Sequence, residues 1–340
     1  MTKPQDGNQP ERRSTRTTLQ ETSSDNTVDV RPPNGGYGWI CVGCICLINA
    51  HTWGINGWFT TKRSLASGFA TCGSALGGLI YSLGANAMIE NISLPWAFRI
   101  LAIVSFVVNT GSSLLLRDRN TQTKNRPAIF EIRLLKNYNF LLVLLWAAFS
   151  LIAYTIVLFS IPDYGESEGL SADQGALLGA LVNLGQVVGR PGVGFLSDRF
   201  GRLNVSSVMT FLSGLLCFIF WIFAREYVSI LAFSLVIGLF VGTFWASLAP
   251  IVAEVLGLHE TINGLNICWM VLVSPVTVCE IIGLVLRKPG GNEYLHVQIF
   301  TGALYVAASL CLLLLRRQMV RNRDLSKPGA AGLIFGFTKL

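Results

Sequence analysis

Long apolar runs separated by short polar connections dominate this chain. The runs cover residues 40–57, 65–89, 98–116, 140–161, 175–196, 205–223, 228–252, 264–286 and 296–315. An α-helix needs about 20 apolar residues to cross the ~30 Å hydrocarbon layer of a bilayer. We therefore expect an all-α membrane protein with about nine spans, and the short connections predict one antiparallel bundle.

Composition supports this class. Hydrophobic residues make up 51% of the 340 positions and charged residues only 13%, whereas a soluble domain carries about 25% charged residues. The net charge of +7 is dispersed over the ends of the apolar runs rather than gathered on one soluble face, which argues against nucleic acid as a partner. The eight cysteines all fall within the apolar runs, and we expect them to pack there without binding metal.

The basic residues predict how the chain lies in the membrane. Stretches 62–63, 117–136, 199–202 and 316–339 hold most of them from the second run onward, whereas the opposite ends of the runs hold only Arg99, Arg225, Arg287 and Lys288. Because cytoplasmic loops are enriched in Lys and Arg, the 117–139 loop and the C-terminus are expected in the cytoplasm.

Several motifs resemble one transporter family. Residues 34–39 (NGGYGW) resemble the entry to the first span of the monocarboxylate porter family, within the major facilitator superfamily. Residues 58–68 (WFTTKRSLASG) with 73–78 (GSALGG) resemble that family's second signature, at its fifth span, and 48–56 (INAHTWGIN) look like its fungal branch. Residues 194–202 are similar to the superfamily loop G-x-x-x-D-R-x-G-R.

The resemblance implies a twelve-span fold from which spans two to four are missing here. A hypothesis follows that residues 56–59 mark an internal deletion in the gene model or transcript. The expected organisation is then a disordered cytoplasmic-type tail (1–38), a shortened N-terminal half (39–116), a basic cytoplasmic linker (117–139), a six-helix C-terminal half (140–317) and a cytoplasmic tail (318–340).

A polar stripe runs through the fifth apolar run. Asn183, Gln186 and Arg190 are three and four residues apart, so they share one helix face. An arginine at mid-membrane depth costs about 2.5–3.5 kcal/mol on insertion scales, so it needs a polar cavity or a partner. Two interpretations remain open: Arg190 binds an anionic substrate group in a cavity, or it bonds helix carbonyls or Asp198 near the cytoplasmic surface.

Proton coupling at this stripe is placed in doubt by Gln186. Family members that carry protons with small carboxylates have an acid four residues before this arginine, and an amide does not ionise near neutral pH. The resemblance therefore leaves the solute open among small polar or anionic organic molecules, monocarboxylates included, with or without a coupling proton.

The loop at Asp198, Arg199, Gly201 and Arg202 resembles a conformational latch of the superfamily, in which the acid pairs across a helix end in one access state. The alternative is that this loop is a basic signal that fixes the topology of the chain in the membrane.

The weaker substrate-binding candidates are His51, Asn266 and Trp269, with Phe244 and Trp245 as further aromatic residues that could line the cavity. Each of them also suits packing or an interfacial position. Glu280 is a candidate for ion coupling, or for pairing with Arg287.

The sequence thus predicts a secondary active transporter that works by alternating access. No zinc-peptidase, nucleophile-elbow or phosphate-binding-loop motif is found in it, so neither an enzyme, a cofactor nor an ATP-driven pump is expected. The expected partners are a small-molecule solute and the bilayer of the plasma membrane or of an internal, vacuolar-type membrane. The alternative is a truncated, non-transporting or receptor-like membrane protein. The oligomeric state stays open.

Overall fold

The computed structural model describes residues 62–115, 131–257, 260–288 and 293–326, and within them all regular structure is helical. The all-α fold class is therefore confirmed. The expected first span, 40–57, and the candidate His51 lie outside the described residues. The helices are α2 (Arg63–Asn91), α3 (Leu94–Leu115), η1 (Ile132–Lys136), α4 (Tyr138–Ser167), α5 (Ala172–Phe200), α6 (Arg202–Leu216), η2 (Cys217–Trp221), α7 (Tyr227–Val241), α8 (Thr243–Leu256), α9 (Thr261–Leu286) and α10 (Leu295–Ser326).

Six helical stretches of the described part are long and apolar enough to cross a membrane, namely 95–114, 138–167, 202–221, 227–256, 261–286 and 295–322. The predicted runs 65–89 and 175–196 also form helices, α2 and α5. These two are the least apolar, because α5 carries the Asn183–Arg190 stripe and α2 contains several serines and glycines. The predicted count of nine spans stays a prediction.

Two of the predicted spans are interrupted. The helix α6 continues into η2, a short stretch of wider π-helical turns. The run 228–252 forms two helices, α7 and α8, that meet at Gly242. Hydrophobicity is continuous across this junction, so the sequence pattern did not reveal the break.

Two apolar clusters hold the helices α4 to α10 together. One is formed mainly by α4, α8, α9 and α10, with Trp146, Phe244 and Ile267 among its buried members. The other joins α4, α5, η2, α7 and α10 around Trp221 and Phe233. Because α4 contributes residues to both clusters, it connects the two apolar clusters to each other.

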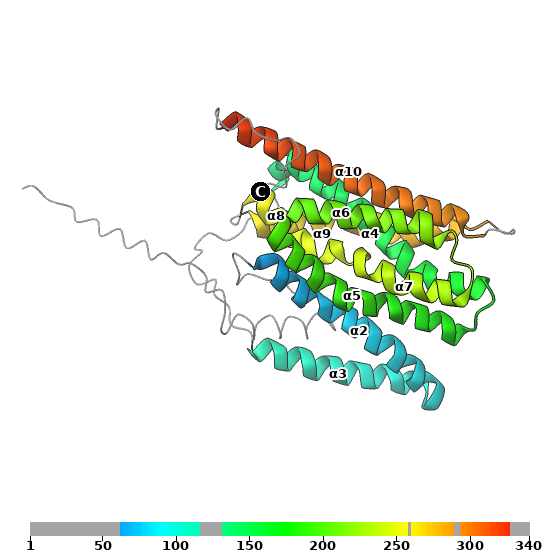
Figure 1. Cartoon of the computed structure of the whole chain (residues 1–340). Coiled ribbons are helices and arrows are strands. Elements are labelled where there is room, and N and C mark those ends of the chain that lie inside the picture. Colours follow the sequence, from blue (N-terminus) through cyan, green and yellow to red (C-terminus); the bar gives the residue numbers. More distant parts are fainter. Residues whose placement is uncertain (1–61, 116–130, 258–259, 289–292, 327–340) are drawn as a thin grey trace, which may run out of the picture. The chain divides into compact units, whose positions relative to one another are not determined.

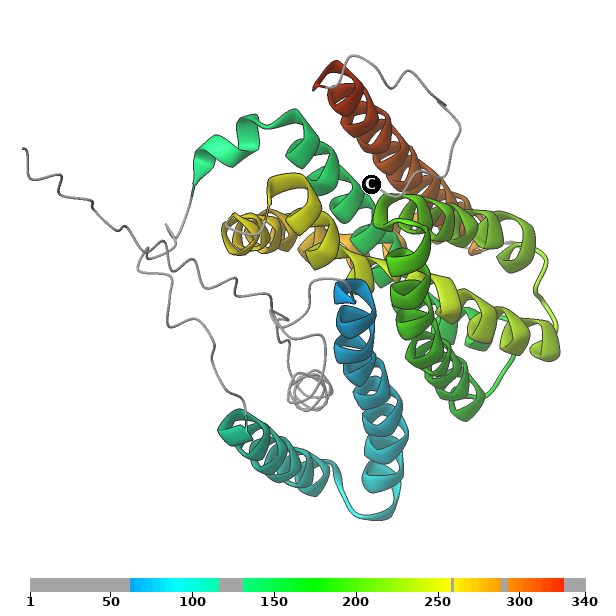
Figure 2. The same cartoon turned by 60° about the vertical axis from the view of Figure 1, so that its left-hand side comes forward.

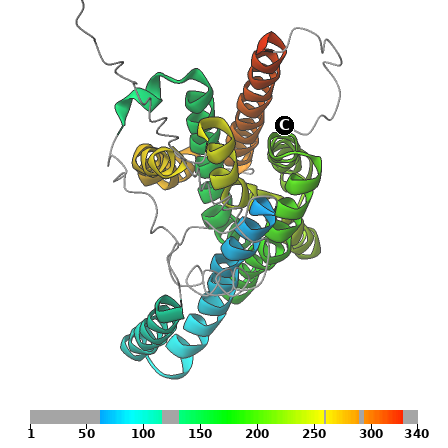
Figure 3. The same ribbon diagram turned by 90° about the vertical axis from the view of Figure 1, so that its left-hand side faces the viewer.

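Helix α5 lies in close contact with α2 on one side and α7 on the other (Figures 1 and 3). A methyl group on Gly185 would lie 2.5 Å from the Leu235 carbonyl oxygen of α7 and 2.8 Å from Gly238 Cα. Towards α2, a methyl group on Gly194 would collide with the Ser64 carbonyl oxygen. Small residues therefore set the helix spacing on both sides of α5, as in other membrane helix pairs.

Helix α3 packs along α2 and lies away from the C-terminal helices (Figure 2). Only 11% of its apolar stretch is buried, and Phe98 and Phe106 are 65% and 72% exposed. An apolar surface of this kind suits contact with lipid.

Two glycines of α5 give a matched test of this packing. We expect Gly185→Ala to lower the thermal stability of the purified protein, because the added methyl forces α5 away from α7; overpacking of this kind costs about 1–3 kcal/mol. Gly192→Ala is the control, since a methyl there meets nothing within 4 Å among the described residues. The measurement is the melting temperature in detergent, and equal melting temperatures for the two variants would contradict the packing.

Candidate functional site

The most deeply buried charge of the described region is Arg190, which is only 2% exposed. One terminal nitrogen of its guanidinium donates to the Thr71 carbonyl oxygen and to the Ser74 hydroxyl, both on α2. The other donates to Gln186 Oε1 at 2.5 Å, one turn earlier on α5. Arg190 therefore ties α2 to α5 through its planar, fork-shaped set of donors.

The predicted polar stripe forms a continuous hydrogen-bonded row. Gln186 Oε1 also accepts from the Tyr154 hydroxyl of α4 at 3.2 Å, and Gln186 Nε2 donates to Asn183 Oδ1 at 3.5 Å. Asn183 in turn donates to the Gly179 carbonyl oxygen. The sequence placed Asn183, Gln186 and Arg190 on one face, and the structure joins them side chain to side chain.

Gly242 makes room for the arginine. A methyl group at this position would lie 2.8 Å from Arg190 Cγ and 3.1 Å from Arg190 Nε. The α7–α8 junction therefore sits where the guanidinium crosses. Within the described residues, Arg190 Nε is buried and has no hydrogen-bond partner, which is unusual for a buried polar group.

Aromatic side chains continue the polar row towards α8 and α9. The Tyr154 ring meets the Trp245 indole edge-on, with ring centroids 5.8 Å apart. Trp245 stacks on Trp269 at 5.7 Å and an interplanar angle of 18°. Trp245 is partly buried, whereas Trp269 is 37% exposed. The candidate Asn266 is exposed one turn before Trp269.

The candidate latch residue Asp198 lies at the first turn of α2. Its two carboxylate oxygens accept from the backbone nitrogens of Ser64 at 3.2 Å and Leu65 at 2.9 Å. No side chain of α2 itself caps this end. Asp198 therefore caps a helix from another helix, which satisfies two otherwise orphan donors and places a negative charge at the positive end of the helix dipole.

The other loop residues surround this contact. Gly201 joins α5 to α6 with a φ of 94°, a conformation that favours glycine. Arg202 donates to the Ser64 hydroxyl at 3.1 Å and lies 3.9 Å from Glu254 of α8, whereas Arg199 is exposed and lies over the Phe200 ring. Burial and the neighbouring Arg202 lower the pKa of Arg63, at the start of α2, and Asp198 opposes that shift.

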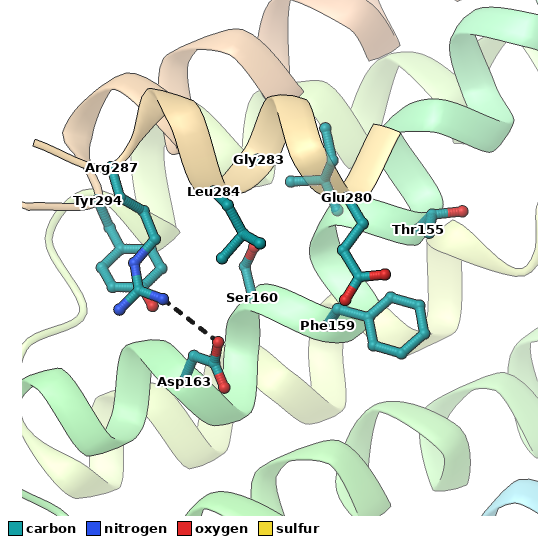
Figure 4. Close-up of a pocket in the computed structure, with 10 residues that line it drawn as sticks. Thr155, Phe159, Ser160, Asp163, Glu280, Gly283, Leu284, Arg287 and Tyr294 are labelled. Carbon is teal, nitrogen blue, oxygen red and sulfur yellow. Dashed lines mark hydrogen bonds and ion pairs between the residues drawn. The ribbon is translucent and has the colours of Figure 1, made fainter. Parts of the chain in front are cut away.

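Glu280 lies in a separate pocket between α4 and α9 (Figure 4). The ion pair with Arg287 that was one of its expected roles is not formed: among the residues described, Arg287 pairs with Asp163 at 3.4 Å and Glu293 at 3.5 Å. Arg287 also lies over the Tyr294 ring, and burial raises the pKa of that phenol. The cavity measures about 30 Å³, room for about two water molecules and too little for an organic solute.

Sequence reasoning missed Thr71, Ser74, Tyr154 and Gly242 as members of the site. Thr71 and Ser74 are three residues apart on α2, so their common helix face was the available signal. Tyr154 is a polar-tipped residue inside the predicted run 140–161. Their partners lie on other helices, and spacing along one helix does not show which residue of another helix is opposite.

Comparison with known proteins agrees with this architecture. The family model of the Major Facilitator Superfamily matches residues 49–277. A probable transporter of Saccharomyces cerevisiae, MCH2, is 30% identical over 276 residues, covering 79% of this chain and 58% of that protein. The uncharacterized transporter ESBP6 of the same yeast is 32% identical over 284 residues, covering 78% and 42%.

A third relative is the MFS transporter asaE of Aspergillus flavus, 26% identical over 286 residues, with 81% of this chain and 63% of that protein covered. The chain thus spans about half the length of the curated relatives it matches. The family model covers most of the described helices, from α2 into α9, together with the site around Arg190. The chain therefore belongs to the major facilitator superfamily.

Proposed function

We propose that this protein is a secondary active transporter of a small polar or anionic organic solute, monocarboxylate-like, that works by alternating access. The observation that supports it best is the position of Arg190. Its charge is buried between α2 and α5, and its partners on α2 are a backbone carbonyl and a hydroxyl rather than a carboxylate. A solute carboxylate offers this guanidinium a stronger, charge-assisted partner than either.

Movement of α2 away from α5 would release these neutral partners. The guanidinium nitrogen that bonds Thr71 and Ser74 would then be free to bind a solute anion, while Gln186 continues to hold the other nitrogen. Return of α2 would restore its own carbonyl and hydroxyl as partners and expel the anion. In this scheme the two expected roles of Arg190, helix contact and substrate binding, belong to different states of one cycle.

Asp198 would act as the latch of this movement. Its carboxylate holds the first turn of α2 at the end of the interface where Lys62 and Arg63 lie, the predicted cytoplasmic side. Capping contacts of this kind are worth about 0.5–2 kcal/mol. They therefore favour the state in which the predicted cytoplasmic ends of α2 and α5 are in contact, without preventing the two helices from separating.

We propose the plasma membrane as the location, with internal membranes as the alternative.

Arg190→Ala tests the binding role. We expect loss of uptake without a fall in membrane abundance, because the variant lacks the donors for the anion but keeps the helix spacing set by glycine. The measurement is initial uptake of radiolabelled lactate, pyruvate and acetate into cells expressing the chain. Arg99→Ala, which removes an exposed arginine lying over Trp96 on α3, is the control and should retain uptake. Normal uptake by Arg190→Ala would refute the role.

The same uptake assay separates this function from its alternative. If the parent chain moves none of these acids but a version extended by the three spans that the family resemblance predicts does, the parent chain is a non-transporting form. Sequencing the transcript across codons 56–59 then decides whether a deletion is the cause. A transcript with no further coding sequence between these codons would exclude the deletion.

Gln186→Glu tests the role of the amide. We expect reduced uptake at neutral pH, because the introduced carboxylate neutralises Arg190 and competes with the solute anion. A protonated carboxyl is neutral, as the amide is, so uptake should recover as the pH falls and this group binds a proton. Gln174→Glu, in the capping box of α5, is the control, since Glu is accepted at this position of the box. Uptake by Gln186→Glu that matches the parent at neutral pH would contradict this role.

Asp198→Asn tests the latch. The amide offers only one oxygen acceptor and no charge, so we expect the predicted cytoplasmic ends of α2 and α5 to separate in a larger fraction of molecules, by about 2- to 30-fold for a contact of this size. Distances between spin labels on the two helix ends measure that fraction. Asp173→Asn, at the opposite end of α5, should leave the distances unchanged. A distribution of spin-label distances that is unchanged in Asp198→Asn would contradict the latch role of Asp198.

A further inference from the structure

The pocket between α4 and α9 is lined by oxygen-bearing side chains and lies apart from Arg190 (Figure 4). Glu280 and Asp163 each bring a carboxylate, and Thr155, Ser160 and Tyr294 each bring a hydroxyl. These groups come from α4, from α9 and from the residue just before α10. Oxygen ligands of this kind are those that small, hard cations prefer.

Glu280 brings an uncompensated charge to this pocket. Within the described residues its carboxylate has no hydrogen bond or ion pair, and its expected partner Arg287 is engaged by Asp163 and Glu293. Glu280 lies about two turns before the end of α9, inside a predicted membrane span. An ionised carboxylate in such a place is costly unless a positive group accompanies it. The pocket therefore favours a cation beside Glu280.

Tyr294 provides a second, independent indication of a ligand. Its side chain lines the pocket and the residue is only 2% exposed, yet its hydroxyl oxygen is buried without a hydrogen-bond partner in the described part of the chain. The ring itself is held in place, because Arg287 lies over its face and Tyr164 meets it edge-on at 5.4 Å. Buried hydroxyls nearly always have a partner in folded proteins, so the missing partner of this one points to a ligand in the pocket.

Size and charge narrow the ligand to one class. The cavity of about 30 Å³ has room for a small ion and a water molecule, but not for an organic molecule. Two carboxylates and one guanidinium line it, which leaves a net charge of −1 that a single monovalent cation neutralises. A calcium ion takes roughly six to eight oxygen ligands and a magnesium ion keeps several waters, and the cavity is too small for either shell.

We infer that this pocket binds a small monovalent cation such as Na⁺ through Glu280, Asp163, Ser160 and Tyr294, and that this cation accompanies the solute anion. The second part rests on the proposed function, because it makes the ion at Glu280 the partner of the anion at Arg190. Helix α4 connects the two sites: Thr155 lines the pocket, and the preceding residue, Tyr154, donates to Gln186 in the row that holds Arg190.

Radioactive Na⁺ binding to the purified full chain in lipid nanodiscs tests the site, with choline replacing Na⁺ to keep the ionic strength constant. Glu280→Gln removes the charge and keeps the shape of the side chain. Tyr294→Phe removes only the hydroxyl and keeps the ring contacts. Glu226→Gln is the control, since Glu226 is an exposed acid on the same predicted outer side and does not line the pocket. Melting temperatures show that each variant is folded.

We expect the parent and Glu226→Gln to bind Na⁺ with equal affinity. Affinity should fall about 10-fold or more in Glu280→Gln, because a charged ligand is lost, and about 2- to 10-fold in Tyr294→Phe, because a neutral one is lost. No saturable Na⁺ binding by the parent would overturn the inference, as would equal affinities of the parent and a folded Glu280→Gln.

Flux of lactate, pyruvate and acetate into proteoliposomes, with an inward gradient of Na⁺ or of choline, separates the inference from the proposed function. We expect faster flux with Na⁺ in the parent and no such difference in Glu280→Gln. Na⁺ binding that depends on Glu280, without flux of any acid, contradicts transport and leaves the cation site standing. Flux that is equal in Na⁺ and choline supports transport and overturns the role of the cation as companion of the solute.

Discussion

A buried arginine between two helices is the constraint on which the rest of this site depends. The guanidinium of Arg190 is almost fully removed from solvent, and an unpartnered charge in such a place costs several kcal/mol. Two of its partners belong to α2, so α2 has to approach α5 closely enough for a backbone carbonyl to reach the guanidinium. That approach requires Gly68 and Gly194, where any side chain would strike the facing backbone.

The same constraint explains features on the other side of α5. The guanidinium crosses at Gly242, the junction of α7 and α8, where any side chain would strike Arg190. Arg190 also fixes the orientation of Gln186, since the amide oxygen that bonds the guanidinium then accepts from Tyr154. The position of Tyr154 in turn places its ring against Trp245. One charge thus positions groups on α2, α4, α5 and α8.

Sequence reasoning reached the parts of this arrangement that lie along one helix. The helix period puts Asn183, Gln186 and Arg190 on one face, and the long apolar runs identify the helices themselves. The contacts between glycines and residues of neighbouring helices could not be predicted in this way. Among the described contacts Gly185 and Gly189 pack on α7, and α2 is met through Gly68, Gly78 and Gly194. Such pairings depend on helix rotation, which glycine spacing on a single helix does not determine.

The chemistry of the two faces of α5 indicates which one can open. Towards α7, backbone meets backbone at Gly185, Gly189 and Gly238, and these contacts have no polar replacement in a membrane. Separation there would leave an apolar gap, because the dispersion attraction between the two helices would disappear and nothing would replace it. Towards α2, Asp198 and Arg190 supply hydrogen bonds that water or a solute can replace almost one for one. In the proposed cycle helix α5 would therefore move with α7, because the α2–α5 interface, although it is also close-packed at Gly68 and Gly194, holds the hydrogen bonds that water or a solute can replace.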